Sequence, residues 1–404
     1  RILPSPLLDA SPAFSGACRF WGVDSRRPWR EVDNHSVPGD PEISVILPTR
    51  DRPEKLGACL RAFAGQTISP ERFEILVALD GDDPASERLV QEFSRALPFD
   101  LRLVRCERRG IAHAKNELLA AARGTYILSI NDDILPAPSF VEAHLRAQRD
   151  AAAKTESGAM VLGATPWVVH QPDRLFDRMI RETSMVFFYD RMAASPHANN
   201  PDHDWGFRHA WNMNLSMPRA RAIEGGGYTV FPDPIYYEDI ELAFRLQRRV
   251  GMPVVYRPQA IAAHDHRYEP AQYLAREEVL GRTAWGVAKV CPDFSHALFG
   301  RDITDPREIA YSREYVEREA PMVEKIRETV LGTTEAHSEG LGPGALRVLY
   351  EHHLPLKRWH WRVGLLRAVD GVGHDEAQRL AHLGASQAEK NPRKPSAVTM
   401  GAGR

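Results

Sequence analysis

The sequence of 404 residues has few cysteines, no long apolar run and almost no net charge. Its four cysteines lie far apart without a CxxC pair, which argues against a disulfide framework or a zinc ribbon and favours a reducing compartment. No apolar run approaches the roughly 20 residues that span a bilayer, and we expect no signal peptide. A formal charge of −2 gives no overall field toward nucleic acid or anionic lipid. We expect a soluble, cytoplasmic protein that binds no nucleic acid.

The composition is that of a globular, loop-rich chain. Hydrophobic residues make up 43% and charged residues 26%, which argues against wholesale disorder. The 28 glycines and 30 prolines favour a loop-rich enzyme over a helical bundle. Residues 1–42 are expected to be an irregular arm, and residues 386–404 a disordered polar tail.

Short apolar runs alternate with helical patterns from residue 43 to 148. Strands are predicted at Ile43–Pro48, Phe73–Asp80, Leu101–Cys106 and Tyr126–Asp132. Helices are predicted at Glu54–Phe63, 84–96, Ala112–Ala122 and Ser139–Gln148. This alternation indicates right-handed βαβ units and a parallel sheet in an α/β fold. The nearly continuous apolar character of the strands is typical of a sheet covered on both faces.

The alternation weakens after residue 151. We expect strands at Met160–Val169 and 253–258, with mostly loop over 170–237. The stretch 238–249 has the acidic start and composition of a helix, although its apolar spacing also fits a strand. Further helices are predicted at 272–290, 306–330 and 344–369, the last broken at Pro355.

Polar loops follow all four predicted strands of the first half. In parallel α/β sheets, ligands bind at the carboxyl ends of the strands. The four loops lie at Pro48–Arg52, Asp80–Asp83, Glu107–Gly110 and Asn131–Asp133, and the third leads to His113, Lys115 and Asn116. Each alone could be an ordinary turn. Together, they indicate a charged ligand site at one sheet edge.

The acids of Asn131-Asp132-Asp133 follow a buried strand directly. Close carboxylates repel each other unless a cation accompanies them, and Mg²⁺ or Mn²⁺ completed by diphosphate oxygens meets that requirement. A solvated loop with a helix cap is the equally weighted alternative.

Two further patterns carry candidate chemistry. Glu238 and Asp239 open a predicted helix, where acids also complement the helix dipole. His264 and His266 alternate along an extended segment, so both rings lie on one face at the spacing of a metal-ligand pair. A single histidine is more often structural.

In order and spacing, these stretches resemble the inverting family 2 glycosyltransferases with the GT-A fold. The resemblance covers residues 43–268, a little over half the chain. It is carried by ISVILPTRDRP, EILVALDGDD, RRGIAHAKNELLAAARGTYILSINDD, WNMNLSMPR, YYEDIELAFRL and VYRPQAIAAHDH.

The resemblance implies a GT-A domain, mostly a parallel Rossmann-like sheet, with a nucleotide-sugar site. The donor side would involve Thr49, Arg52, Asp80, Lys115, Asn131 and Asp132. Lys115 stands where the family usually has arginine, which keeps the charge but loses the bidentate fork. The family's Asp-x-Asp motif appears here as Asn131-Asp132-Asp133. Asp133 is then the expected ligand of Mn²⁺ or Mg²⁺, with His264 completing the shell and His266 in reserve.

The resemblance also implies the reaction. Asp239, paired with Glu238, would be the base that deprotonates an acceptor hydroxyl as it attacks the anomeric carbon, with inversion. Trp211 and Asn214 would border the acceptor, although Trp211 fits a buried core position equally well. The expected partners are a UDP, dTDP or GDP sugar and a glycan or glycolipid acceptor, as in cell-surface polysaccharide synthesis.

The remainder of the chain gives weaker indications. We divide it into the arm, a domain at 43–270, a helical region at 271–385 and the tail. The stretch 346–369 mixes tryptophans with cations. This mixture is typical of a helix packed on the domain. It also fits peripheral contact with the inner membrane face, an interpretation that we weight half as much. The sequence does not predict an oligomeric state.

Four rival functions remain open. A retaining GT-A enzyme need not carry an acid pair like Glu238-Asp239. A sugar-phosphate nucleotidyltransferase would be expected to have a glycine-rich basic loop after the first strand, and PTRDRP has no glycine. A non-catalytic sugar-binding relative is a third alternative because Asn131 and Lys115 depart from the family pattern. A metal hydrolase built on His264 and His266 is the weakest.

Overall fold

The computed structural model describes residues 39–232, 236–333 and 340–371. The expected tail and all but the last four residues of the expected arm lie outside these ranges.

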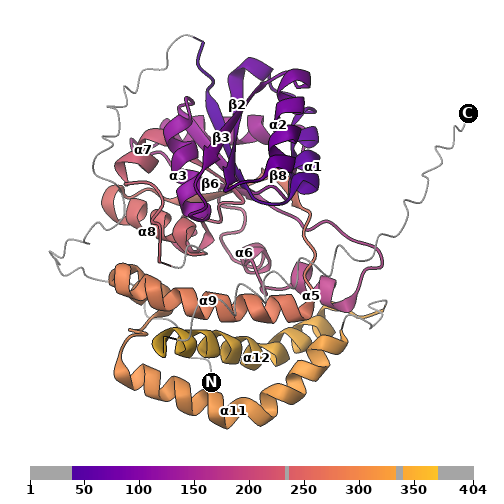
Figure 1. The fold of residues 1–404 in the computed structure, drawn as a ribbon, viewed down its shortest axis with the longest axis vertical. Coiled ribbons are helices and arrows are strands. Elements are labelled where there is room, and N and C mark those ends of the chain that lie inside the picture. Colours follow the sequence, from indigo (N-terminus) through magenta and orange to yellow (C-terminus); the bar gives the residue numbers. More distant parts are fainter. Residues whose placement is uncertain (1–38, 233–235, 334–339, 372–404) are drawn as a thin grey trace, which may run out of the picture.

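The first half of the chain forms the predicted parallel α/β layer (Figure 1). Its strands run in the order β3-β2-β1-β4, all parallel. Every residue of β1 and β2 is buried, because helices cover both faces. The strands are β1 (Ile43–Thr49), β2 (Phe73–Asp80), β3 (Asp100–Cys106) and β4 (Tyr126–Ile130). The helices are α1 (Pro53–Phe63), α2 (Pro84–Ala96), α3 (Ile111–Ala121) and α4 (Phe140–Ala152).

The sheet continues beyond β4 in mixed orientation, in the order β7-β6-β8-β5. Its strands are β5 (Ile134–Pro136), β6 (Met160–Ala164), β7 (Asn214–Pro218) and β8 (Val254–His264). β7 runs antiparallel to both β4 and β6. The strand predicted at Met160–Val169 ends earlier, and the one predicted at 253–258 extends to His264, which brings that histidine to the sheet edge.

The stretch 170–237, predicted to be mostly loop, also contains several short helices and one strand. Besides β7, this stretch holds α5 (Leu175–Glu182), α6 (Tyr189–Ala193) and α7 (Arg219–Glu224), with a 3₁₀ turn at Phe207–His209. The 3₁₀ turn at Pro70–Arg72 precedes β2. The predicted helix at 238–249 is present as α8 (Glu238–Val250).

Four helices form a layer beneath the sheet domain, with α12 lying between α9 and α11 in Figure 1. They are α9 (Pro270–Val290), α10 (Pro292–Phe299), α11 (Pro306–Gly332) and α12 (Pro343–Val369). The predicted break at Pro355 was wrong, since α12 passes through it. The carbonyl of Glu351, which loses its amide partner to the proline, belongs to an exposed residue where water can replace it.

Glycines allow α9 and α12 to touch. A Cβ on Gly281 would lie 1.8 Å from the carbonyl oxygen of Trp361, and one on Gly364 would lie 1.8 Å from that of Glu278. Both distances are far below contact, so only glycine fits at either position. The stretch expected as either a packed or a membrane-facing helix therefore packs closely on α9.

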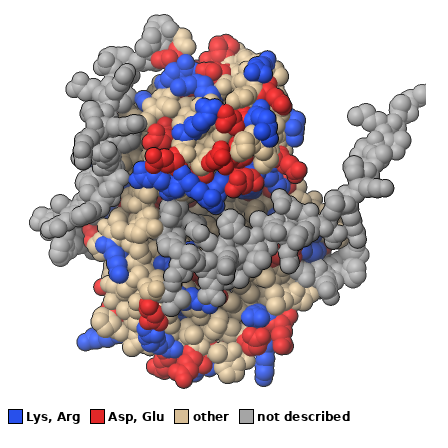
Figure 2. All heavy atoms as spheres, in the orientation of Figure 1, with Lys and Arg blue, Asp and Glu red and all other residues tan. Residues whose placement is uncertain are grey.

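The core lies mainly around the sheet, and a second apolar cluster joins α5 to the helical layer through Phe176, Tyr273 and Leu356. On the face drawn in Figure 2, cations and acids are interspersed, in keeping with the small net charge. No helix in the described ranges has both the length and the apolar character needed to cross a membrane.

Candidate active site

The loops after β1 and β4 meet at the sheet edge, as their strand positions predict. The Thr49 hydroxyl donates to Asp132 Oδ2 at 2.7 Å. Arg52 lies 2.9 Å from Asp132 Oδ1 and 2.7 Å from Asp133 Oδ2. Asp132 and Asp133 are both 4% exposed, so the arginine compensates two buried carboxylates at once. Asn131 is half-buried, and its carbonyl accepts from Ile134 N–H at 3.3 Å, which closes the turn into β5.

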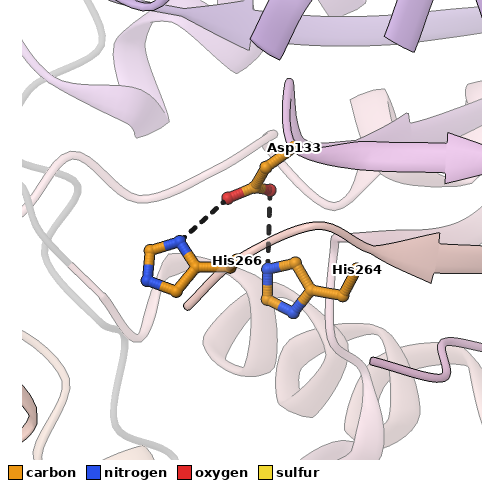
Figure 3. A group of neighbouring side chains, drawn as sticks. All are labelled: Asp133, His264 and His266. Carbon is orange, nitrogen blue, oxygen red and sulfur yellow. Dashed lines mark ion pairs between the residues drawn. The ribbon is translucent and has the colours of Figure 1, made fainter. Parts of the chain in front are cut away.

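Two histidines complete a compact group around Asp133 (Figure 3). His264 Nε2 lies 3.5 Å from Asp133 Oδ1, and His266 Nδ1 lies 3.3 Å from Oδ2. Both imidazoles point toward the carboxylate, one from the end of β8 and one from just beyond it. The ligand atoms of the three residues lie within 4.8 Å of one another, so the group could hold a metal ion.

An unmet hydrogen bond at this group fits a cation. Within the described ranges, buried Asp133 Oδ1 has no hydrogen-bond partner. Buried polar atoms normally have a hydrogen-bond partner, so an unpaired one needs an explanation. An ion bound at the site is one such explanation. A carboxylate with two imidazoles is a ligand set that Mn²⁺ and other transition metals accept, whereas Mg²⁺ prefers oxygen. The residues present therefore fit a divalent metal.

The electrostatics differ sharply between the two acids. Burial raises the pKa of Asp132 to about 6, against the opposing charge of Arg52. Burial also acts to raise the pKa of Asp133, but His264, His266 and Arg52 outweigh it and hold that pKa well below its usual range. Asp133 is therefore ionised at neutral pH, as a metal ligand must be.

Residues that the sequence did not single out support the histidines. The indole of Trp167 stacks on His264 with ring centres 4.3 Å apart. Asp265 donates its N–H to the Asp133 carbonyl at 2.8 Å, and its carboxylate binds Lys55 at 2.6 Å. These contacts fix the ring orientation and tie the segment after β8 to α1. Lys55 lies 210 residues from Asp265 in sequence, so no local pattern could reveal the pair.

Asp80 lies at the end of β2 and caps the turn before α3. Its Oδ1 accepts the N–H groups of Arg109 and Gly110, each at 3.0 Å. Arg50 Nη1 lies 3.5 Å from Oδ2. The acid thus holds the loops after β1, β2 and β3 together, while the contact with a nucleotide stays a prediction.

Lys115 lies on α3 but pairs with the acid pair of α8. Its Nζ is 2.8 Å from Glu238 Oε1, and both side chains are almost fully buried. The Lys115 ammonium also lies 5.4 Å from the ring centre of Tyr228. The adjacent Asn116 exchanges two hydrogen bonds of 2.8 Å with the Tyr228 backbone. In this arrangement Lys115 neutralises Glu238, and the predicted donor contact stays untested.

Asp239 differs from its neighbour. Its Oδ1 accepts from Ile240 N–H at 2.8 Å, and its Oδ2 accepts weakly from Asn212 N–H at 3.4 Å. Asp239 has no ion-pair partner in the described part of the chain, and its side chain is partly exposed. Burial and the nearby Glu238 charge raise the pKa of Asp239 to about 6. A proton acceptor of that basicity is poised near neutral pH.

The backbone before this pair is strained. Tyr236 and Tyr237 have φ of 69° and 71°, a left-handed conformation that non-glycine residues rarely adopt. Strain of this kind persists only where the surroundings enforce it and often marks a functional site.

The two predicted acceptor residues lie in different surroundings. Trp211 is 8% exposed and packs in an aromatic cluster with Phe187 and Tyr189, at 5.1 and 5.0 Å between ring centres. Asn214 is fully buried, and its amide nitrogen donates to the carbonyls of Ala164 and Ala260. Its Oδ1 faces His144 Nε2 at 2.7 Å. The structure thus places Asn214 in the core as a cross-strand tie, and we propose no acceptor contact for it.

The fold and the site define a class of protein. A mixed α/β sheet with acidic loops at one edge and a C-terminal helical layer is the GT-A fold with a helical extension, as expected. Residues 44–213 match the sequence model of Glycosyl transferase family 2. Residues 44–213 therefore form a family 2 glycosyltransferase domain, which confirms the resemblance seen in the sequence.

Named relatives agree with this class. The chain is 26% identical over 227 residues to validoxylamine A glucosyltransferase of Streptomyces hygroscopicus subsp. limoneus, covering 53% of this chain and 49% of the relative. It is 30% identical over 109 residues to the uncharacterized glycosyltransferase YfnE of Bacillus subtilis (strain 168), covering 27% of each. The chain thus spans about half or less of the length of these relatives.

Two solved structures are similar to this chain over most of its length. The mannosyltransferase PcManGT from Pyrobaculum calidifontis, in complex with GDP-Man and Mn²⁺, has a TM-score of 0.41 at 17% identity, over 90% of this chain and 84% of its own. Residues 1–349 of S. aureus TarS give a TM-score of 0.43 at 12% identity, over 82% of this chain and 92% of theirs.

Proposed function

We propose that the protein is an inverting, metal-dependent glycosyltransferase that moves a sugar from a nucleoside diphosphate to a hydroxyl group. The observation that carries this proposal is the contrast between the two acids at the start of α8. Lys115 neutralises Glu238, whereas Asp239 has a raised pKa and no ion-pair partner in the described ranges. One carboxylate is held in place, and the other is free to accept a proton.

Asp239 is the base in this proposal. An acceptor hydroxyl has a pKa far above neutral, so it must lose its proton as it attacks the anomeric carbon. The proton passes to a carboxylate oxygen of Asp239. Backbone N–H groups of Asn212 and Ile240 orient that carboxylate, and the buried Lys115–Glu238 pair fixes the helix start that carries it.

The donor occupies the edge formed by β1, β2 and β4. Thr49 and Arg52 position Asp132 and Asp133. Asp80 holds the backbone just before α3 by accepting two of its N–H groups. Asp133, His264 and His266 would hold the divalent cation, which when bound neutralises charge on the departing diphosphate. Since two of the three ligands are imidazoles, Mn²⁺ suits this group better than Mg²⁺.

The acceptor is a saccharide or glycolipid hydroxyl in this proposal. Trp211, which packs against Phe187 and Tyr189, borders the acceptor in this proposal. The packing of α12 on α9 supports a structural role for that helix, so we propose no membrane contact through it.

The test is a transfer assay with product analysis. Asp239→Asn is expected to reduce turnover by several orders of magnitude while nucleotide binding persists, and the exposed Asp150→Asn is the matched control. The product of the wild-type enzyme is expected to have the anomeric configuration opposite to that of the donor. A product that retains the donor configuration, or full turnover by Asp239→Asn, would contradict the proposal. The alternative, a retaining or non-catalytic nucleotide-sugar-binding relative, predicts those results.

A further inference from the structure

The helical layer presents a cluster of cations that the proposed reaction does not use. Arg276 of α9 lies 2.9 Å from Glu277 Oε1, and Lys357 of α12 lies 3.6 Å from the same oxygen. The Glu277 side chain is 1% exposed, whereas those of Arg276 and Lys357 are 18% and 28% exposed. Lys357 also donates to the Met185 carbonyl at 2.8 Å. The carboxylate is thus enclosed, and both cations keep a solvent-facing side.

This cluster carries excess positive charge. Two cations face one carboxylate in the described part of the chain, and Arg191 lies within electrostatic range of Lys357. Burial outweighs the nearby Glu277 charge and lowers the pKa of Lys357, so the charge of this buried ammonium is incompletely compensated. An anion that enters the site would complete the charge balance.

Arg276 adjoins both parts of the active site. Its guanidinium lies 5.3 Å from the ring centre of Tyr236. Tyr236 is the first of the two residues with positive φ that come directly before Glu238. Tyr268 lies within electrostatic range of Arg276, and its ring centre is 4.3 Å from that of His266. Through Tyr236 and Tyr268, the cluster therefore adjoins both the start of α8, which carries Asp239, and the metal-ligand group of Asp133, His264 and His266.

We propose that Arg276, supported by Lys357, forms a subsite for a phosphate group, contributed to the transferase site by the helical layer. The planar guanidinium offers paired N–H donors that match phosphate oxygens, and a lysine nearby adds a point charge. The phosphate would come either from the donor diphosphate or from a phosphate-bearing acceptor. The assignment of its source rests on the proposed function, whereas the subsite itself does not.

The first experiment uses the full chain without nucleotide. Inorganic phosphate and pyrophosphate are titrated calorimetrically into the wild type, Arg276→Gln, Arg276→Lys and the control Lys289→Gln, an exposed position on the same helix. We expect saturable binding that Arg276→Gln weakens roughly tenfold or more, that Arg276→Lys partly restores and that Lys289→Gln leaves unchanged. Absence of binding to the wild type, or equal binding by Arg276→Gln, overturns the proposal. If Arg276→Gln does not fold, Lys357→Gln is compared instead on the same terms.

The second experiment identifies the source. A nucleoside diphosphate and the matching nucleoside are titrated with Mn²⁺ into the same variants. Weaker binding of the diphosphate alone by Arg276→Gln assigns the subsite to the donor. Unchanged diphosphate affinity, with phosphate binding still dependent on Arg276 in its presence, assigns it to the acceptor. If no nucleoside diphosphate binds the wild type while phosphate binding depends on Arg276, the proposed function fails and the subsite stands.

Discussion

Asp239 makes the protein less stable at the pH at which it would work. Its pKa is raised from 3.8 to about 6, so the folded state disfavours the ionised form. A shift of about two units corresponds to about 3 kcal/mol. Because the folded state binds the proton more tightly, stability falls as the pH rises from about 4 to about 6 and stays lower above that range.

Replacing the carboxylate by an amide removes this penalty. We expect Asp239→Asn to raise the free energy of unfolding by up to about 3 kcal/mol at pH 8 and by about half as much at pH 5. The side chain is partly exposed, so these values are upper bounds. If Asp239 is the base that we propose, the same variant should lose transfer activity, since catalytic groups are often held in a state that costs stability.

The assay is urea unfolding of Asp239→Asn, the exposed Asp150→Asn control and the wild type between pH 5 and pH 8. The stabilisation should grow with pH in Asp239→Asn and be absent in the control. A destabilised Asp239→Asn at pH 8, or a gain independent of pH, would refute the account of Asp239 as a raised-pKa base.

Further predictions concern the metal group, the buried pair and the helix crossing. His264→Ala should abolish the thermal stabilisation that Mn²⁺ gives the wild type, because one of three ligands is lost; an unchanged shift would remove His264 from the ligand set. Lys115→Met should lower the free energy of unfolding by about 3–5 kcal/mol, since Glu238 stays buried without its partner. Adding Glu238→Gln to this variant should recover part of the lost stability. If denaturant unfolding shows no recovery, the pairing is contradicted. Gly281→Ala should lower the melting temperature because its Cβ meets a backbone carbonyl at 1.8 Å, whereas Gly332→Ala, with nothing within 4 Å, should leave it nearly unchanged; equal melting temperatures would contradict the close crossing.

The sequence predicted the first four strands and helices closely. Strands such as Phe73–Asp80 are buried on both faces, so their apolar runs are continuous and end sharply at charged loops. The strand β7 was missed because it is short and carries Asn214 and Ser216 in the core. Those side chains are satisfied by His144, a partner about 70 residues away that no local pattern reveals.

The sequence indicated which residues belong to the candidate site, but not which of them contact one another. The alternation of His264 and His266 was visible in the sequence, but only the structure brings both to Asp133. Lys115 was expected at the donor, yet it pairs with Glu238, 123 residues further along. This pairing depends on how the fold brings the Lys115 side chain of α3 to the start of α8, which composition and spacing do not encode.

The most direct test of the account is metal-dependent nucleotide binding at the sheet edge. Wild type, Asp239→Asn and Asp133→Ala are titrated calorimetrically with UDP, GDP, dTDP and CDP, with and without Mn²⁺. The account predicts that at least one nucleotide binds the wild type and Asp239→Asn only with Mn²⁺, and that Asp133→Ala loses this binding. Binding that is independent of the metal and of Asp133, or no binding by any of the four, would contradict it.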